Sequence, residues 1–398
     1  MSAKRPHIAI LGAGPVGLEA ALAAAEAGHP FTVYEQSGGP GAAVAGWGHV
    51  RLFSPWDLDV SPRQRRALAA AGADAPSGSA CPTGRELIDR VLAPVAGLPE
   101  IAPRVAYGTR VLGVGRQGLV KHQEIANPVR AARPFRLLVA DAAGERVDQA
   151  DVVLDCTGTW GQPNRLGDGG IPALGESALD GEIRRHVPDF AAEADEWAGR
   201  TVFLAGSGHS AQTAACALAE LAAARPGTRV LWAVDRAPQP IEDDPLPERA
   251  RLMRRAGELA EGMSAAVEAL PGARVEALAR NGHGLVLSVR LPEGGRDEVH
   301  AERVLSLTGY VGDPSLHRQL QVHQCYATEG PMKLSAALLG AAGGDCLAAG
   351  GHGVETLKNP EPGFFLLGSK SYGRNASFLM RAGWQQVDEV FADLAAQA

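Results

Sequence analysis

Twice along this chain, a short apolar strand runs directly into a glycine-rich turn and then into a helix of small residues. In the first copy the strand covers residues 7–11, the turn contains Gly12, Gly14 and Gly17, and helix-forming residues continue to position 27. Gly12 permits the tight turn, Gly14 lets the backbone approach a pyrophosphate, and Gly17 lets the helix pack closely on the strand. The N-terminus of that helix offers free N–H groups to phosphate. This copy predicts a dinucleotide site near the start of the chain.

An acidic residue at the end of the next strand strengthens this prediction. Strand 31–34 ends in Glu35, whose carboxylate can accept both ribose hydroxyls of a nucleotide. The strand, helix and acid around the turn distinguish it from an isolated glycine pattern. The alternative is a glycine turn that only packs a helix on a sheet. The residues expected to bind the cofactor here are Gly12, Gly14, Pro15, Val16, Gly17, Glu35 and Gln36.

The second copy begins with strand 201–205 and continues into Gly206, Gly208 and Ser210, with Ala211 in place of the third glycine. Alanine is still small enough for close packing of helix and strand. Ser210 is predicted to be the N-cap of the following helix and a neighbour of a phosphate. The chain is therefore predicted to be an α/β protein with two Rossmann-type dinucleotide-binding domains.

Two adjacent charged residues bear on which nicotinamide nucleotide the second site takes. Strand 229–234 is followed by Asp235 and Arg236. A guanidinium at this place can pair with a 2′-phosphate, which favours NADP(H), whereas a carboxylate suits the 2′-hydroxyl of NAD(H). The sequence favours NADP(H) and leaves NAD(H) open, and the alternative for Arg236 is a surface arginine at a strand end.

Two rival sites can be weighed. Gly208-His-Ser210 between strand and helix is similar to the nucleophile elbow of hydrolases, but Gln212 replaces the last glycine of that motif. Nothing in the spacing of Asp313 and His352 supports them as the remaining members of a triad. No metal site is predicted, because His317, His323, Cys325 and His352 match no metal-ligand spacing. The acidic run 242–244 is predicted to be a solvated loop.

Length and composition limit the number of domains and the classes of partner that the protein can have. At roughly 150 residues per domain, 398 residues predict two or three domains. A net charge of −7 argues against a nucleic-acid partner, which would select a basic surface. No apolar run reaches the roughly 18 residues of a membrane helix. The five scattered cysteines, without a C-x-x-C pair, suit a reducing cytoplasm and exclude a dithiol relay. We therefore expect a cytoplasmic protein that binds neither nucleic acid nor membrane.

The first glycine turn with Glu35 resembles the FAD site of flavoproteins that carry two dinucleotide-binding domains. Further stretches share this resemblance. Residues 151–160, with Thr157 and Gly158, resemble the crossing from the FAD domain to the NADP domain, and residues 304–310 resemble the return crossing. Val111 lies in a segment that resembles the strand whose backbone meets the adenine. Residues 363–369 resemble the C-terminal strand and turn that place a helix N-terminus at the flavin; Gly368 is followed by Ser369 where the family has Asp.

Two motifs narrow the resemblance to a bacterial branch of flavin-containing monooxygenase-like proteins, the CzcO-like or arsenic-operon (ArsO) group. They lie at residues 47–56 and 370–374, and the similarity covers nearly the whole chain. The resemblance implies FAD, a nicotinamide nucleotide, dioxygen and a small-molecule substrate. It implies oxygenation of a soft nitrogen, sulfur or metalloid nucleophile through a flavin C4a-hydroperoxide. The monooxygenase fingerprint F-x-G-x-x-x-H is replaced by a distorted version around Gly181 and His186.

The resemblance also implies the organisation of the chain. The FAD domain is expected to cover residues 1–165 and 300–398, with the nicotinamide domain at 166–299 inserted between its parts. Residues 163–199 are predicted to be a linker. The last helix is predicted at about 377–397, and its residues expected to face a core are Phe378, Leu379, Val387, Val390, Phe391 and Leu394. Hairpins are predicted around residues 142–144 and 293–295.

Three residues are candidates for the catalytic centre. Arg51 and His49 follow the FAD turn, and Lys370 adjoins the turn that is expected to face the flavin. A cation near flavin N1 and O2 would stabilise the anionic reduced form. The alternatives are an ion pair of Arg51 with Asp57 or Asp59, a core histidine, and a lysine that caps a turn. Two other functions stay open: an NADPH-dependent flavin reductase or dehydrogenase with a separate acceptor, and a non-catalytic redox-sensing flavoprotein. A homo-oligomer is also left open.

Overall fold

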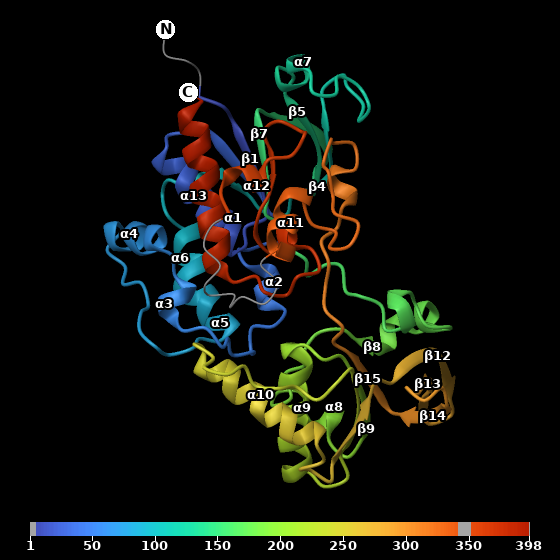
Figure 1. The fold of residues 1–398 in the computed structure, drawn as a ribbon. Helices are drawn as coiled ribbons and strands as arrows, with labels where there is room; N and C mark the ends of the chain where they lie inside the picture. Colours follow the sequence, from blue (N-terminus) through green and yellow to red (C-terminus); the bar gives the residue numbers. More distant parts are fainter. Residues whose placement is uncertain (1–4, 341–351, 398) are drawn as a thin grey trace. The chain divides into compact units, whose positions relative to one another are not determined.

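The computed structural model describes residues 5–340 and 352–397; Cys346 lies outside these ranges. The chain divides into two compact units (Figure 1). The first unit comprises the chain up to Gly48, Pro55–Gln162 and the chain from Val311 onward. The second comprises His49–Ser54 and Pro163–Tyr310.

A five-stranded parallel sheet forms the centre of the first unit, in the order β16-β7-β1-β2-β3. Its strands are β1 (Ile8–Leu11), β2 (Phe31–Tyr34), β3 (Val105–Ala106), β7 (Val152–Asp155) and β16 (Phe364–Leu366). Strands β1, β7 and β16 are buried along their whole length. Apart from Asp155, which ends β7, these strands are apolar, and such runs are typical of parallel strands that are covered on both faces.

Two long helices of the first unit pack side by side, and one of them, α1, also contacts β1 and β2 of the sheet (Figure 1). They are α1 (Pro15–Glu26) and α13 (Met380–Ala396), and Gly383 of α13 approaches Val16 of α1. The prediction that Val387, Val390, Phe391 and Leu394 face a core is confirmed. Phe378 and Leu379, predicted in the same helix, precede its first residue and are half-buried. The other helices of the unit are α2 (Ala42–Ala45), α3 (Trp56–Asp59), α4 (Pro62–Ala70), α5 (Gly84–Leu87), the π-helical turn Ile88–Leu92, α6 (Ala93–Ala96), α7 (Pro128–Ala131), α11 (Met332–Gly340), α12 (Val354–Leu357) and 3₁₀ turns at Ala102–Arg104, Ser315–His317 and Gly368–Tyr372.

An antiparallel sheet of three strands completes the first unit. It consists of β4 (Arg110–Arg116), β5 (Phe135–Asp141) and β6 (Gly144–Ala150), paired in sequence order. The predicted hairpin between residues 135 and 147 is therefore confirmed, with Asp141 and Gly144 as the pair that closes its turn.

The second unit repeats the parallel arrangement. Its sheet has the order β11-β10-β9-β15-β8, made of β8 (Ile183–Arg184), β9 (Thr201–Ala205), β10 (Arg229–Val234), β11 (Val267–Pro271) and β15 (Arg303–Ser306). Its helices are α8 (Ala194–Trp197), α9 (His209–Ala224) and α10 (Pro247–Ala260). A second antiparallel sheet contains β12 (Arg274–Asn281), β13 (Gly284–Arg290) and β14 (Arg296–Ala301), so the hairpin predicted at 293–295 is present.

The stretch 163–199 is not the linker that its composition predicts. It holds 3₁₀ turns at Asp168–Gly170 and Glu176–Glu182, helix α8, and strand β8, which pairs with β15 at the edge of the sheet. The carboxylate of buried Glu176 accepts hydrogen bonds from the N–H groups of Leu166 and Ala173 and so fixes the segment. Strand β15 pairs with β9 of this sheet, and the compact second unit extends to Tyr310. Among the described residues, none of the helices combines the length and apolarity that crossing a bilayer requires.

Candidate dinucleotide-binding sites

The first glycine turn is shaped by close backbone contacts. Gly12 has a φ of +97°, and a Cβ there would lie 2.9 Å from the carbonyl oxygen of Cys156. A Cβ on Gly17 would collide with the carbonyl oxygen of Gly12. Gly14 is the N-cap of α1, and apart from Gly14 and its chain neighbours no atom of the described residues lies within 4 Å of where its Cβ would be. The first turn of α1 therefore presents its N–H groups beside an open approach over Gly14, which suits a pyrophosphate.

The Glu35 carboxylate lies against this turn. It is 7% exposed and accepts hydrogen bonds from the N–H groups of Ala13 (2.8 Å) and Ser37 (2.9 Å). A carboxylate has about four acceptor positions, so these two bonds leave capacity for ribose hydroxyls. Gln36 is exposed immediately beyond it. Tyr107 follows the neighbouring strand β3, and burial together with the Glu35 charge raises the pKa of its phenol.

Two further turns meet the first at the carboxyl edge of the sheet. Thr157 and Gly158 follow β7, and Gly368 and Ser369 follow β16. A Cβ on Gly368 would lie 3.2 Å from Val16, and one on Gly158 would lie 3.6 Å from Ser369 Oγ. The structure therefore brings together the predicted residues of three distant segments. Ligands of open parallel sheets bind outside this edge.

The segment after β16 differs from its prediction in one respect. Gly368–Tyr372 is a short 3₁₀ turn, and the long helix α13 begins only at Met380. The Gly368 N–H donates to Gln386 Oε1 (2.8 Å), which ties this turn to α13. The backbone of Gly368 and Ser369, rather than the end of an α-helix, is what the structure offers to a ligand here.

Lys370 is held in a buried ion pair beneath these turns. Its Nζ lies 2.6 Å from Asp155 Oδ2 and 3.2 Å from Thr157 Oγ1, and Thr157 Oγ1 donates to Asp155 Oδ1 at 2.6 Å. The side chains of Lys370, Asp155 and His317 are 4%, 0% and 3% exposed. Burial would raise the pKa of the Asp155 carboxyl, but Lys370 and His317 together hold it well below its usual range. The pair connects β7 to the turn after β16.

The remaining residues predicted for the first site lie in different places. Val111 is half-buried in β4 and pairs with Val139 of β5. His49 and Arg51 are exposed and belong to the second unit. Of the two carboxylates offered as partners for Arg51, Asp57 lies 3.5 Å from Arg65 in an ion pair, and Asp59 is 3% exposed.

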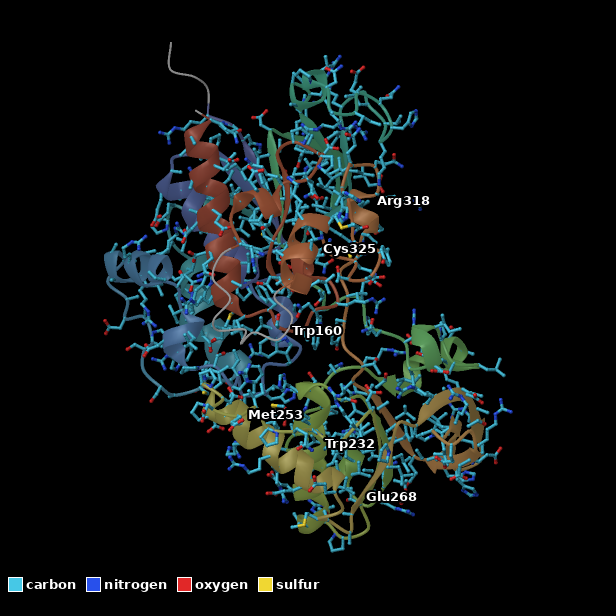
Figure 2. The ribbon with its side chains drawn as sticks, viewed as in Figure 1. Trp160, Trp232, Met253, Glu268, Arg318 and Cys325 are labelled. Carbon is cyan, nitrogen blue, oxygen red and sulfur yellow. The ribbon has the colours of Figure 1, made fainter. Side chains whose placement is uncertain are left out.

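The second glycine turn has the same design as the first. Gly206 has a φ of +130°, and a Cβ there would collide with the carbonyl oxygen of Leu307. Gly208 is the N-cap of α9, and apart from Gly208 and its chain neighbours no atom in the described part of the chain lies within 4 Å of where its Cβ would be. Trp232 lies in the middle of β10 (Figure 2) and is fully buried. Its Nε1 donates to the Gly206 carbonyl at 2.9 Å. A rigid indole therefore supports this turn.

Two predictions about this site need correction. Ser210 is not the N-cap of α9: helical geometry starts at His209, because extended Gly208 already occupies the cap, and Ser210 is exposed in the first turn. The loop 242–244 is not wholly solvated, because the Asp244 side chain is buried and accepts two hydrogen bonds from Arg249. Burial, and then the charge of Arg249, lowers the pKa of His209, so its imidazole is neutral near pH 7.

At the carboxyl end of β10 the structure shows an ion pair between Asp235 and Arg274, which the sequence alone does not predict. Asp235 donates its N–H to Ser207 Oγ (2.8 Å) in the glycine turn, and its carboxylate lies 2.7 Å from Nη1 of Arg274. Arg236 beside it is exposed. Arg274 starts β12 and lies 38 positions after Arg236 in the sequence.

In the first unit, Asp155 is a site residue that the sequence reasoning missed. Its place at the end of an apolar strand and just before a Thr-Gly turn was a usable signal.

No protein-family model and no curated protein matches the chain. Solved structures do match its fold over nearly the full length of both chains. A bacillithiol disulfide reductase of Bacillus cereus has a TM-score of 0.66 and 18% identity, covering 99% of this chain and 100% of the other. An ornithine N-hydroxylase of Kutzneria sp. 744, solved with reduced FAD, NADP⁺ and L-ornithine, has a TM-score of 0.65 and 15% identity, with 99% of each chain covered.

A flavin monooxygenase of Stenotrophomonas maltophilia, solved as a variant with two substitutions, has a TM-score of 0.62 and 20% identity, with both chains covered completely. At such low identity these likenesses concern the fold. The chain has the fold of two-Rossmann-domain oxidoreductases, and the predicted fold class is confirmed.

Proposed function

We propose that this protein is an FAD-dependent oxidoreductase that uses NADPH, with FAD held by the first unit and the nicotinamide nucleotide by the second. The observation that carries the proposal is the convergence of three turns and Glu35 at one sheet edge. The open approach at Gly14 and the remaining acceptor capacity of Glu35 fit an adenine dinucleotide. The second unit repeats the open glycine turn at Gly208.

The residues of the chain would divide the work as follows. The first turn of α1 binds the pyrophosphate, and Glu35 holds the ribose. The backbone at Thr157, Gly158, Gly368 and Ser369 lines the path beyond the pyrophosphate, and the Lys370–Asp155 pair keeps those turns together. FAD, when bound, would accept a hydride from reduced nicotinamide and pass electrons to dioxygen or another acceptor. His49 and Arg51 are proposed from the sequence as residues near the isoalloxazine.

The finer proposal is a monooxygenase that acts on a soft nitrogen, sulfur or metalloid nucleophile. It is supported by the resemblance of residues 47–56 and 370–374 to the CzcO-like and arsenic-operon group, and monooxygenases are among the solved proteins of the same fold. The substrate is proposed to be a small molecule, with dioxygen as co-substrate.

A reductase with a separate acceptor is the second candidate, and one observation favours it. The monooxygenase fingerprint is distorted in this sequence. The histidine at its last position, His186, is hydrogen-bonded through Nε2 to Nη1 of Arg184 at 3.1 Å. Burial, followed by the Arg184 charge, lowers the pKa of His186. A reductase is also among the solved proteins of this fold.

Anaerobic reduction tests the proposal. The purified protein is expected to be yellow, to release FAD on denaturation, and to lose its flavin absorbance when NADPH is added without oxygen. A colourless protein that refuses added FAD would refute the proposal. Labelled dioxygen then separates the two candidates: label in the oxidised product supports the monooxygenase, whereas turnover that leaves all label in peroxide or water supports the reductase. Reduction without repeated cycling would indicate a redox sensor instead.

A further inference from the structure

The end of β10 combines opposite signals for the nucleotide that the second unit accepts. Asp235 follows the strand directly, at the place where an acid selects the free 2′-hydroxyl of NAD(H). Its N–H bond to Ser207 Oγ fixes it beside the glycine turn. An uncompensated carboxylate at this position would repel a 2′-phosphate, because like charges that share a site raise each other's energy.

In the structure the guanidinium group of Arg274 forms an ion pair with the Asp235 carboxylate. Gly272, with a φ of +67°, donates its N–H to the Val234 carbonyl (2.7 Å), and this turn brings the start of β12 to the end of β10. Arg274 Nη1 then lies 2.7 Å from Asp235 Oδ1, with the two side chains 41% and 62% exposed. Both groups are therefore accessible to a ligand while they are paired.

The neighbouring carboxylates are paired with other arginines, so they do not draw Arg274 away from Asp235. Asp168 lies 3.9 Å from Arg274 Nε, but its other oxygen is bound by Arg290. Arg290 also pairs with Glu276, which Arg296 contacts from the other side at 2.8 Å. Arg236 follows Asp235 in the chain, so the end of β10 carries one carboxylate that is paired with Arg274 and has a second arginine as its sequence neighbour.

We propose that Arg274 is a specificity-determining residue. By neutralising the Asp235 carboxylate in an ion pair, it allows the 2′-phosphate of NADPH to bind at the end of β10. This inference rests on the proposed function and deepens it. Arg274 holds the Asp235 charge in an ion pair and, with Arg236, offers a cation to the phosphate. Nη1 of Arg274 also donates to the Ala273 carbonyl at 3.3 Å. Its Nη2 would donate a charge-assisted hydrogen bond to a phosphate oxygen.

Calorimetric binding of 2′,5′-ADP and 5′-AMP tests the inference directly, because these probes differ only in the 2′-phosphate. FAD is added first to fill the other site. The wild type is expected to bind 2′,5′-ADP more tightly. In Arg274→Gln, 2′,5′-ADP is expected to bind about tenfold more weakly or worse, the size of a lost charge-assisted hydrogen bond. Binding of 5′-AMP should change by less than about twofold, as for other exposed ion pairs.

Two further variants separate charge covering from a structural role. Asp235→Asn in the Arg274→Gln background should restore part of the 2′,5′-ADP affinity, since no carboxylate is left to cover. Arg280→Gln, at the other end of β12 where the arginine pairs with Glu182, should leave both affinities unchanged. Equal losses for both probes in Arg274→Gln, or no rescue by Asp235→Asn, would overturn the inference.

The same measurements distinguish this inference from the proposed function. A wild-type protein that binds neither probe contradicts both, because its second unit then holds no adenine nucleotide. A wild type that is reduced by NADH and binds 5′-AMP as tightly as 2′,5′-ADP keeps the oxidoreductase but refutes the role of Arg274. The binding experiment itself requires neither turnover nor a known substrate.

Discussion

The Lys370 ammonium lies 2.6 Å from the Asp155 carboxylate inside the first unit, and both side chains are almost inaccessible to water. The two residues are 215 positions apart in the sequence. Their ion pair connects two of the three turns at the edge of the sheet, the one after β7 and the one after β16. Because the cation is committed to Asp155, its main effect is on the geometry of these turns. This relationship can be tested by the pH dependence of stability.

Lys370→Met should destabilise the protein by about 3–5 kcal/mol at neutral pH, since it leaves a buried carboxylate without its partner. In the wild type the Asp155 pKa lies below its unfolded value of about 3.9, so the pair contributes stability above that pH and loses it only in stronger acid. In the variant, burial raises the Asp155 pKa. The free energy of unfolding should therefore increase as the pH falls from about 8 to about 5.

Urea unfolding at a series of pH values measures this effect. Lys333→Met is the matched control, because the Lys333 side chain is 56% exposed and lies 3.8 Å from exposed Glu355. The control should lose less than about 1 kcal/mol and should follow the pH profile of the wild type. A Lys370→Met profile parallel to that of the wild type would contradict a buried, unpaired Asp155.

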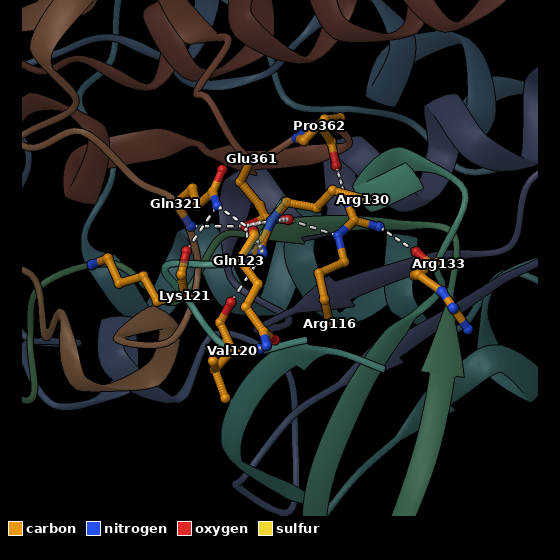
Figure 3. Close-up of polar contacts among 9 residues, drawn as sticks. All are labelled: Arg116, Val120, Lys121, Gln123, Arg130, Arg133, Gln321, Glu361 and Pro362. Carbon is orange, nitrogen blue, oxygen red and sulfur yellow. Dashed lines mark hydrogen bonds and ion pairs between the residues drawn. The ribbon is translucent and has the colours of Figure 1, made fainter. Parts of the chain in front are cut away.

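Glu361→Gln is expected to cost about 3–5 kcal/mol of stability, because two buried guanidinium groups then lose their counterion. The Glu361 carboxylate lies 2.6 Å from Arg116 and 2.7 Å from Arg130, and all three side chains are at most 1% exposed (Figure 3). It also accepts the Gln321 N–H at 2.7 Å. Glu361 stands just before β16, so we expect its loss to disturb the turn at Gly368 as well.

Thermal unfolding and FAD release measured on the same samples check this prediction. Glu298→Gln, on an exposed position of β14, is the control and should change stability by less than about 0.5 kcal/mol. A Glu361→Gln protein with wild-type stability would show that the backbone carbonyls around Arg116 and Arg130 satisfy these cations without the carboxylate.

Local patterns predicted the parts of the fold that short segments determine. Strands 31–34, 201–205 and 229–234 have the bounds that the sequence indicates, because each is an apolar run between a helix end and a turn. Strand β8 was missed because it has two residues, and its pairing with β15 spans 121 positions. Glycine and proline in that stretch indicate turns, but they carry no information about a distant partner strand.

The same limit applies to the candidate sites. The glycine turns and Glu35 could be predicted because all their parts lie within one strand–turn–helix unit. Asp235 and Arg236 could be recognised, but the effect of Arg274 on Asp235 depends on the turn at Gly272 that folds β12 back. In the first unit, Lys370 was identified as a candidate, but its commitment to Asp155 depends on β16 lying next to β7.

Gly14→Trp should abolish FAD retention without unfolding the protein. Its Cβ direction is open among the described residues, so the indole can be accommodated by the fold but would occupy the approach to the first turn of α1. Gly181→Trp is the control, because Gly181 is exposed and similarly open but lies outside both glycine turns. Absorbance spectra and circular dichroism report flavin content and folding. Recovery of the holoprotein from Gly14→Trp would contradict the first site.

Arg236→Ala should weaken NADPH by about tenfold or more and leave NADH within about twofold, because only NADPH carries the phosphate that the guanidinium can bind. The observable is the dependence of the anaerobic flavin reduction rate on each nucleotide. Arg229→Ala is the matched control: Arg229 lies at the opposite end of β10, is 60% exposed and pairs with Glu268, so both nucleotides should be unaffected. Equal weakening of NADPH and NADH in Arg236→Ala would remove Arg236 from the 2′-phosphate site and leave Arg274 as its cation.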